Sequence, residues 1–264
     1  MRNLQEKYGD WALITGASAG IGKAFARYIA AAGMNVILVA RRKERLEKLA
    51  EEIKAGNSVQ ALPVALDLTS DDFLEKLKQQ IGDRKIGLLV NNAGFGSVGL
   101  YAHNDAQREA DMVKLHCLVP TILTHHFVRP MMARKKGAII FVGSIVGYQP
   151  VPYISTYSAT KAFNMFLGKS LWYELRKHHI DVLALAPGGT KTEFQQVIHQ
   201  SVSSIAAAPD AVVRTAMKAL GKKPAVVHGV HNKIWAFARR FLPVRMSLSL
   251  HARFMRATTT TNTG

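Results

Sequence analysis

Apolar runs alternate with amphipathic stretches along most of this chain, and each pattern predicts a different element. Seven short apolar runs predict β-strands at 11–15, 35–40, 59–66, 86–91, 138–143, 181–186 and 225–228. Pro63 lacks a backbone N–H group and predicts an irregularity in the third strand. The runs are apolar at almost every position, which indicates parallel strands covered by helices on both faces. The pattern therefore predicts an α/β fold, a single doubly wound domain with a parallel seven-stranded sheet.

Helical spacing of apolar residues marks the longer segments between the strands. Residues 106–132 predict one long helix, and residues 155–176 predict another. We expect residues 1–230 to form one domain that includes a variable loop at 193–208. Residues 231–264 predict a basic amphipathic C-terminal extension, which Pro243 should divide into two helices. Residues 258–264 predict an unstructured polar tail.

Positive charge is concentrated at the end of the chain. The formal net charge is +17, and residues 211–264 contain ten lysines and arginines and no aspartate or glutamate. No nucleic-acid-binding motif accompanies this charge, so we expect no nucleic acid partner. Aromatic residues such as Trp235 and Phe237 are interleaved with the cations. Such a segment can lie on an anionic membrane surface, or it can pack across the domain or a subunit interface, and the pattern leaves both open.

Other features restrict the compartment and the chemistry. Cys117 is the only cysteine, which excludes an intramolecular disulfide and favours a reducing compartment. The histidines at 125–126 and 178–179 are adjacent pairs whose side chains diverge on a helix, so we predict no metal site. Residues 1–10 lack the apolar core of a secretory leader, and no run reaches the ~18 apolar residues of a membrane span. We expect a cytoplasmic protein that can reach a membrane only peripherally, through its extension.

A glycine-rich turn joins the first predicted strand to the first predicted helix. Gly16 permits a tight turn, Gly20 lets the backbone approach a pyrophosphate, and Gly22 lets the helix pack close to the sheet. The free N–H groups and the positive end of the helix dipole then face the phosphates. The turn predicts a dinucleotide site formed by Gly16, Ser18, Ala19, Gly20, Ile21 and Gly22.

The end of the second strand indicates which dinucleotide binds. Sites specific for NAD place a carboxylate there, which accepts a hydrogen bond from the ribose 2′-hydroxyl. This chain has Arg41 and Arg42, and a guanidinium cannot accept a hydrogen bond but can pair with a 2′-phosphate. Arg41 therefore predicts NADP(H) as the cofactor, and Arg42 either shares this role or lies on the surface.

With further motifs, the chain resembles the short-chain dehydrogenase/reductase (SDR) family over about residues 9–230. The matching positions are the glycine turn, Asp67-Leu68, Asn91-Asn92-Ala93-Gly94, Ser144, Tyr157 with Lys161, and Pro187-Gly188 with Thr190 and Thr192. The resemblance implies a Rossmann-like fold in which Asp67 and Leu68 contact the adenine and residues 92–94 lie beside the cofactor. It also implies that residues 187–192 hold the nicotinamide carboxamide and phosphates, that Tyr157 and Lys161 contact the cofactor, and that the protein is a homo-oligomer.

The serine, tyrosine and lysine can carry carbonyl chemistry. Tyr157 and Lys161 are four residues apart, so they share one face of a helix. A phenol has an unperturbed pKa of ~10, and a nearby ammonium together with an oxidised nicotinamide should lower that pKa. We expect Tyr157 to act as general acid in reduction and as general base in oxidation, while Ser144 hydrogen-bonds the substrate oxygen.

One position departs from the family pattern. His116 stands where the family has an asparagine that holds a water between the lysine and solvent. An imidazole can donate and accept hydrogen bonds, so His116 could keep that water as a fourth catalytic residue, with a charge that changes near neutrality. The alternative is a buried histidine with a structural partner, and the sequence does not decide between the two.

In this family the substrate pocket is built after the fifth and sixth strands, which here means residues 145–153 and 193–208. The first segment offers an apolar wall of Val146, Tyr148, Val151, Pro152 and Tyr153, and the second offers a lid of Phe194, Val197 and Ile198. We predict an NADP(H)-dependent oxidoreductase that moves a hydride between nicotinamide and an apolar ketone, aldehyde or secondary alcohol. Two alternatives stay open: a membrane-associated reductase of lipid 3-keto groups, and a cofactor-binding protein with little catalysis.

Overall fold

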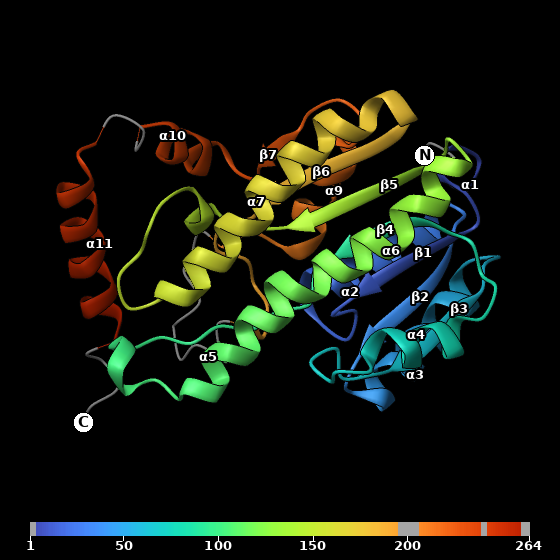
Figure 1. The fold of residues 1–264 in the computed structure, drawn as a ribbon, viewed down its shortest axis with the longest axis horizontal. Coiled ribbons are helices and arrows are strands. Elements are labelled where there is room, and N and C mark those ends of the chain that lie inside the picture. The colour runs from blue at the N-terminus through green and yellow to red at the C-terminus, as the bar shows by residue number, and fades with distance from the viewer. Residues whose placement is uncertain (1–3, 195–205, 239–241, 260–264) are drawn as a thin grey trace.

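Seven parallel strands run through the centre of the molecule, in a computed structural model that describes residues 4–194, 206–238 and 242–259 (Figure 1). The strands are β1 (Trp11–Thr15), β2 (Asn35–Ala40), β3 (Ala61–Ala65), β4 (Ile86–Asn91), β5 (Gly137–Val142), β6 (Ile180–Ala186) and β7 (Ala225–Val227). Their order in the sheet is β3-β2-β1-β4-β5-β6-β7, and each neighbouring pair is parallel. The predicted doubly wound α/β fold is confirmed.

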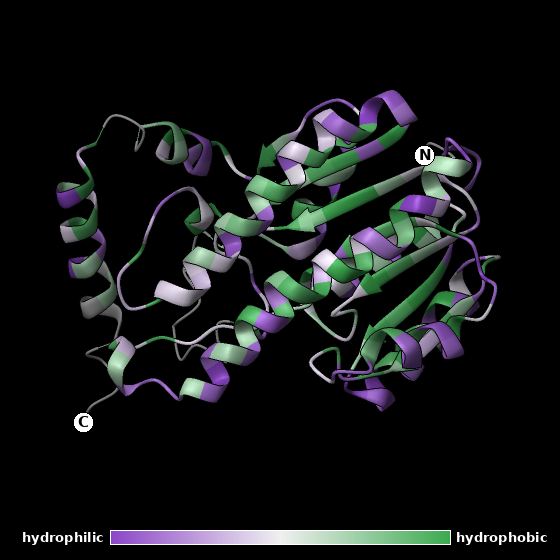
Figure 2. Ribbon diagram, in the orientation of Figure 1, coloured by the Kyte–Doolittle hydropathy of each residue, from purple (hydrophilic) through white to green (hydrophobic). Residues whose placement is uncertain are grey.

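Helices cover both faces of this sheet, and an apolar core lies on each side of it. One face carries α2 (Gly20–Ala31), α3 (Lys43–Gly56) and α9 (Pro209–Ala219), and the other carries α4 (Phe73–Ile81), α6 (Val119–Ala133) and α7 (Ser155–Leu175). Figure 2 shows apolar strands between helices that also carry polar residues. Other short elements are α1 (Leu4–Tyr8), which the sequence analysis missed, and the 3₁₀ helices η1 (Tyr101–His103), η3 (Ile145–Tyr148) and η4 (Arg176–His178).

The long helix predicted at 106–132 is interrupted. α5 (Ala106–Val113) and α6 are joined by a π-helical segment, η2 (Lys114–Leu118). Pro120 has no N–H group, so it cannot donate to the carbonyl four residues earlier, which belongs to His116. That carbonyl instead accepts a hydrogen bond from Asn164 Nδ2 at 2.9 Å. The predicted long helix is therefore present, and only its change to π geometry at 114–118 was not predicted.

The irregularity predicted at Pro63 is absent. β3 pairs with β2 in a continuous register that runs through Pro63, opposite Leu38. β3 is the strand at the edge of the sheet, where proline is tolerated because its missing N–H group can face away from the neighbouring strand.

The C-terminal extension forms two helices, α10 (Val230–Ala238) and α11 (Val244–Thr259). The predicted break at Pro243 is confirmed, and α11 continues into the region where an unstructured tail was predicted. In Figure 1, α11 stands apart from the sheet, on the side toward which the strands point. None of the helices within the described ranges is both long and apolar enough to span a membrane.

Candidate active site

The candidate site lies at the carboxyl ends of the central strands. The strand order reverses between β1 and β4, and open α/β sheets bind ligands in the crevice at such a point. The glycine turn leaves β1 there, residues 92–94 leave β4, and Ser144 follows β5. The topology therefore brings together three segments that are far apart in the sequence.

Ser144, Tyr157 and Lys161 lie close to one another. Ser144 precedes η3 and lies close enough to the Tyr157 hydroxyl to lower its pKa. The buried Lys161 places its Nζ 5.6 Å from the centre of the Tyr157 ring and donates to the Val142 carbonyl at 2.9 Å. The four-residue spacing on α7 puts both side chains on one face, as the sequence predicted.

The electrostatics of this pair differ from the expectation. Burial raises the pKa of Tyr157 to about 12, although Ser144 acts to lower it. Burial also lowers the pKa of Lys161 to about 8. The predicted lowering of the phenol pKa is not found in the chain itself, because removal from water opposes charge on both groups. Tyr157 therefore holds its proton at neutral pH, as a proton donor to a developing alkoxide must.

His116 uses both ring nitrogens for protein contacts. The Phe95 N–H donates to Nε2 at 3.0 Å, and Nδ1 lies 2.9 Å from the Thr160 hydroxyl, so the hydrogen-bond pattern assigns the proton to Nδ1. Burial, together with the charge of Lys161, holds the pKa of His116 well below its usual value. This pKa direction opposes a charge that changes near neutrality, which one of the two alternatives required. The geometry fits the alternative, a neutral histidine with structural partners.

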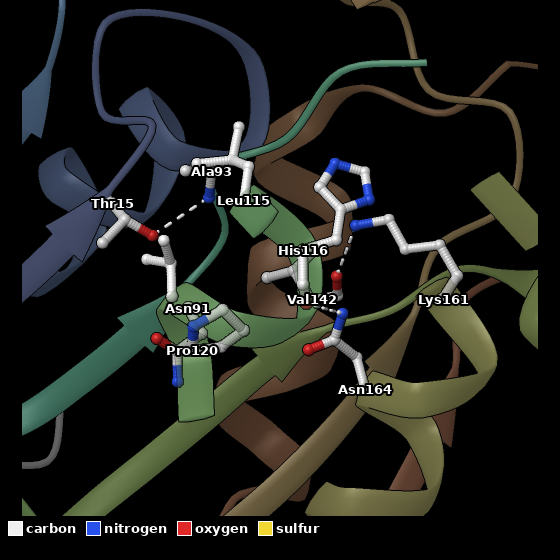
Figure 3. Close-up of a pocket in the computed structure, with 10 residues that line it drawn as sticks. Thr15, Asn91, Ala93, Leu115, His116, Pro120, Val142, Lys161 and Asn164 are labelled. Carbon is white, nitrogen blue, oxygen red and sulfur yellow. Dashed lines mark hydrogen bonds between the residues drawn. The ribbon is translucent and has the colours of Figure 1, made fainter. Parts of the chain in front are cut away.

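A small cavity lies between the π segment, α7 and β1 (Figure 3). Its volume is about 10 Å³, and Lys161 and Asn164 line it from α7 while His116 lines it from the π segment. The Asn164 amide donates to the carbonyls of His116 and Thr160, at 2.9 and 3.1 Å. The sequence analysis missed Asn164, although Pro120 signals a carbonyl at position 116 that needs another donor.

The glycine turn has the features that a bound pyrophosphate requires. Gly16 and Gly20 adopt φ values of +68° and +54°, which other residues rarely adopt. A Cβ on Gly22 would lie 2.2 Å from the Gly16 carbonyl oxygen, so the helix can approach the turn only with glycine there. α2 begins without a side-chain cap from Ala19, which leaves its first N–H groups directed at the turn. The cradle fits a dinucleotide phosphate at a helix N-terminus.

Asn92 and Ala93 fasten the end of β4 to β1. Their backbone N–H groups donate to Thr15 Oγ1 at 2.9 and 3.0 Å, and Asn92 Nδ2 donates to the Thr15 carbonyl at 2.8 Å. A Cβ on Gly94 would lie 2.5 Å from Nε2 of His116. Residues 92–94 are therefore held between the glycine turn and the π segment.

The two arginines after β2 have different surroundings. Arg42 Nη2 donates to Ser18 Oγ at 2.9 Å, and Arg42 Nη1 pairs with Glu193 Oε2 at 2.7 Å. Arg45, which the sequence analysis missed, pairs with the other carboxylate oxygen of Glu193. The hydrogen bonds from Arg42 and Arg45 lower the pKa of Glu193. Both arginines are exposed, but Arg42 reaches the glycine turn through Ser18.

Asp67 and Leu68 follow β3 on the same side of the site. Leu68 is buried, and Asp67 Oδ1 accepts hydrogen bonds from the N–H and hydroxyl of Thr69, at 2.9 and 2.7 Å. Partial burial acts to raise the pKa of Asp67, but these hydrogen bonds and the charge of Arg41 lower it overall. The exposed Arg41 thus contributes to the electrostatics of the predicted adenine position.

The segment after β6 closes the opposite side of the site. The Pro187 carbonyl accepts a hydrogen bond from Ile145 N–H at 2.9 Å, and Thr190 Oγ1 donates to the Gly188 carbonyl at 3.0 Å. A Cβ on Gly20 would lie 2.9 Å from the Thr192 side chain, so this segment touches the glycine turn. The segment after β6 therefore contacts both the loop after β5 and the glycine turn.

The two predicted substrate segments are placed differently. The Phe194 ring lies 5.3 Å from the Tyr157 ring, as a lid residue would, while Val197 and Ile198 lie outside the described residues. Tyr148, Val151 and Pro152 line an apolar cavity of about 590 Å³ together with Phe166 and Leu248. Ser144, Tyr157 and Lys161 are not among its lining residues. Part of the predicted wall thus lies beside Leu248 of α11 and lines a cavity that these three residues do not line.

Residues 10–203 match the family model of the short chain dehydrogenases. The matched range contains the glycine turn, Ser144, Tyr157 and Lys161. The chain belongs to the short-chain dehydrogenase family. The resemblance seen in the sequence is therefore confirmed.

Several short-chain dehydrogenases are similar over most of their length. The 7beta-hydroxysteroid dehydrogenase of Clostridium sardiniense is 34% identical over 236 residues, which cover 88% of this chain and 90% of that protein. The very-long-chain 3-oxoacyl-CoA reductase of Pyricularia oryzae is 34% identical over 238 residues, which cover 88% of this chain and 71% of the relative.

Solved structures agree with these relatives. A 7beta-hydroxysteroid dehydrogenase structure has a TM-score of 0.87 at 30% identity, and the match covers 96% of this chain and 99% of the other. A short-chain dehydrogenase from Sphingobium yanoikuyae in complex with NADPH has a TM-score of 0.78 at 31% identity, covering 88% and 93% of the two chains. The chain is therefore an oxidoreductase of a family that uses a nicotinamide dinucleotide and acts on hydroxyl or keto groups.

Proposed function

We propose that this protein is an NADP(H)-dependent oxidoreductase that interconverts a bulky apolar ketone and its secondary alcohol, with Tyr157 as the proton donor and acceptor. The observation that carries the proposal is the placement of Ser144, Tyr157 and Lys161 at one end of the crevice, next to the Phe194 ring. A bound nicotinamide would supply or accept the hydride.

The chain's own residues supply the proton and the positioning. Ser144 can hold the substrate oxygen beside the Tyr157 hydroxyl, and Tyr157 can donate its proton as the oxygen gains negative charge. The ammonium of Lys161 would favour the phenolate left behind, and the Val142 carbonyl fixes the lysine for this role. Phe194 would shield the reacting groups from water.

The preference for the phosphorylated cofactor rests on the cations around Ser18. Arg42 and Arg45 both pair with the Glu193 carboxylate, which shows that this position accommodates an anion. A 2′-phosphate is an anion with more acceptor oxygens than a carboxylate, and two guanidinium groups suit its geometry. We infer that the phosphate takes the place of Glu193 between the arginines, with Arg42 as the principal contact.

The substrate class is supported by the surroundings and by the relatives. The Phe194 ring beside Tyr157 favours an apolar framework next to the reacting carbonyl. The named activities of the two relatives concern a hydroxysteroid and a very-long-chain 3-oxoacyl-CoA, both of which carry the reacting group on a large apolar framework. A ketone or secondary alcohol on a steroid-like or long acyl framework is therefore the proposed substrate.

The proposal is tested by following NADPH and NADH oxidation with matched ketones of increasing bulk. We expect kcat/KM to be higher with NADPH than with NADH, and higher with steroid ketones or long-chain 3-oxoacyl thioesters than with acetone or a keto acid. Turnover restricted to small polar carbonyls would contradict the substrate class, and equal use of both cofactors would contradict the role of the arginines.

A further inference from the structure

The two C-terminal helices expose apolar and cationic side chains together. Ile234, Phe237 and Val244 are 64%, 63% and 65% exposed, far beyond the usual exposure of such residues. Exposed cations flank these residues in the sequence, with Lys233 before Ile234 and Arg245 after Val244. We define the C-terminal surface as Lys233, Ile234, Phe237, Val244, Arg245, Met246, Leu250 and Arg253, all of which are exposed.

α11 has one face that packs on the protein and one that does not. Ser247, His251 and Met255 are buried, and Gln149 Nε2 lies 2.8 Å from His251 Nε2. Met246, Leu250 and Arg253 recur at intervals of four and three residues, which places them on the opposite face. The helix is thus held by its inner face against the loop after β5, and its outer face combines apolar and cationic groups.

The positive charge of this surface is not balanced by acidic side chains of the extension itself. Residues 211–264 contain no aspartate or glutamate, so no side-chain carboxylate of the extension can pair with its arginines and lysine. A basic amphipathic helix with exposed apolar residues is suited to the boundary between lipid headgroups and acyl chains. Each lysine or arginine near an anionic bilayer contributes about fivefold to the partition constant.

We propose that the C-terminal surface binds the surface of an anionic lipid bilayer, so that the protein associates peripherally with membranes. The charges attract the headgroups, and Ile234, Met246 and Leu250 enter the boundary below them. A nucleic acid would leave these apolar side chains without partners. A second copy docked through the same surface would bring two cationic, acid-free surfaces together.

This interaction goes beyond the proposed enzymatic activity and does not depend on it. It would place the loop around Gln149 near the bilayer, since Gln149 contacts α11. Apolar substrates dissolved in the membrane would then be close to the protein.

The test uses the full chain and co-sedimentation with phosphatidylcholine vesicles, with and without phosphatidylglycerol, at low and high salt. We expect binding to the anionic vesicles that weakens with salt, and little binding to phosphatidylcholine alone. No binding to anionic vesicles at low salt would overturn the proposal.

Two double variants separate the apolar and the charge contributions. Met246→Glu/Leu250→Glu and Arg245→Glu/Arg253→Glu should each weaken binding more than tenfold. Lys48→Glu/Lys54→Glu, on the exposed side of α3, makes the same change in net charge as the arginine variant and should retain binding. Thermal melting and NADPH binding establish that each variant is folded. If Met246→Glu/Leu250→Glu does not fold, the vesicle binding of Arg245→Glu/Arg253→Glu tests the proposal alone.

Two outcomes of this series would overturn the proposal. Equal loss in the α3 variant would show a general charge effect without a specific surface. A smaller oligomer in Met246→Glu/Leu250→Glu, found by light scattering with vesicle binding unchanged, would assign the surface to a subunit interface. Because vesicle binding needs no substrate, its failure is distinguishable from failure of the enzymatic proposal.

Discussion

The side-chain amide of Asn164 donates to the main-chain carbonyl of His116 across 2.9 Å, from α7 to the π segment. Pro120 removes the donor that a regular α-helix would offer to this carbonyl, and the amide replaces it. Asn164 and His116 are both buried. The contact fixes the helix that carries Lys161 to the segment that carries His116.

Removal of this amide should destabilise the protein. Asn164→Ala leaves the His116 carbonyl buried without its donor, which should lower the free energy of unfolding by about 1–3 kcal/mol. Asn57→Ala is the matched control, because Asn57 also caps a carbonyl, that of Ile53, but at a more exposed position. Urea denaturation measures both, and equal losses would contradict the importance assigned to the buried contact.

Lys161 should make stability depend on pH in the alkaline range. Its pKa is about 8 in the folded protein, below the ordinary 10.5, so folding opposes its charged form. The resulting penalty is complete below pH 8 and is relieved as the pH rises toward 10.5. The unfolding free energy of the wild type relative to Lys161→Met should therefore rise by about 2 kcal/mol between about pH 7 and pH 9.5. A difference that stays constant over this range would show that the lysine keeps its ordinary pKa.

The glycine turn should not tolerate a methyl group at its third glycine. In Gly22→Ala the new Cβ would lie 2.2 Å from the Gly16 carbonyl oxygen, so the helix must move away from the turn. We expect NADPH affinity to fall by at least about tenfold, since the N–H groups of the helix no longer meet the phosphate. Gly56→Ala makes the same substitution at the end of α3, where a Cβ would meet nothing within 4 Å, and should bind NADPH normally. Titration of NADPH fluorescence distinguishes the two, and normal binding by both variants would rule out this reading of the turn.

Arg42 should contribute more than Arg41 to the choice of cofactor. Arg42→Ala removes the guanidinium that contacts Ser18 and should cost about 1.5–3 kcal/mol in NADPH binding, with little change for NADH. Arg41→Ala should have a smaller effect, because Arg41 acts on Asp67 through its charge and not on the glycine turn. Arg27→Ala controls for charge, since Arg27 pairs with Glu52. The larger loss falling on Arg41 would restore the assignment made from the sequence.

Much of the fold followed from the period of the apolar positions. Each of the seven apolar runs corresponds to one of the seven parallel strands. A strand that is buried on both faces is apolar at successive positions, so an apolar run without polar alternation predicts it. Motif spacing also located Ser144, Tyr157 and Lys161, since four residues on a helix return to the same face.

The errors arose where a side chain's partner comes from a distant segment. The protonation of His116 depends on the Phe95 N–H group and the Thr160 hydroxyl, which contact its two ring nitrogens. Both residues are distant from His116 in the sequence, so no local pattern connects them with it. The pKa of Tyr157 depends on burial, and burial is a property of the folded chain. Arg45 was missed because its relation to Glu193 spans 148 residues. The predicted homo-oligomer stays a prediction.

The most direct test of the central claim compares Tyr157→Phe with the wild type on a bulky ketone that the wild type reduces. Removal of the phenolic proton donor should lower kcat by about 10²–10⁴-fold while NADPH binding persists. Tyr173→Phe is the matched control, because Tyr173 lies exposed on the same helix and should keep full activity. Loss of turnover in Tyr157→Phe alone is the predicted result, whereas wild-type kcat in that variant would contradict the assignment of Tyr157 as the proton donor.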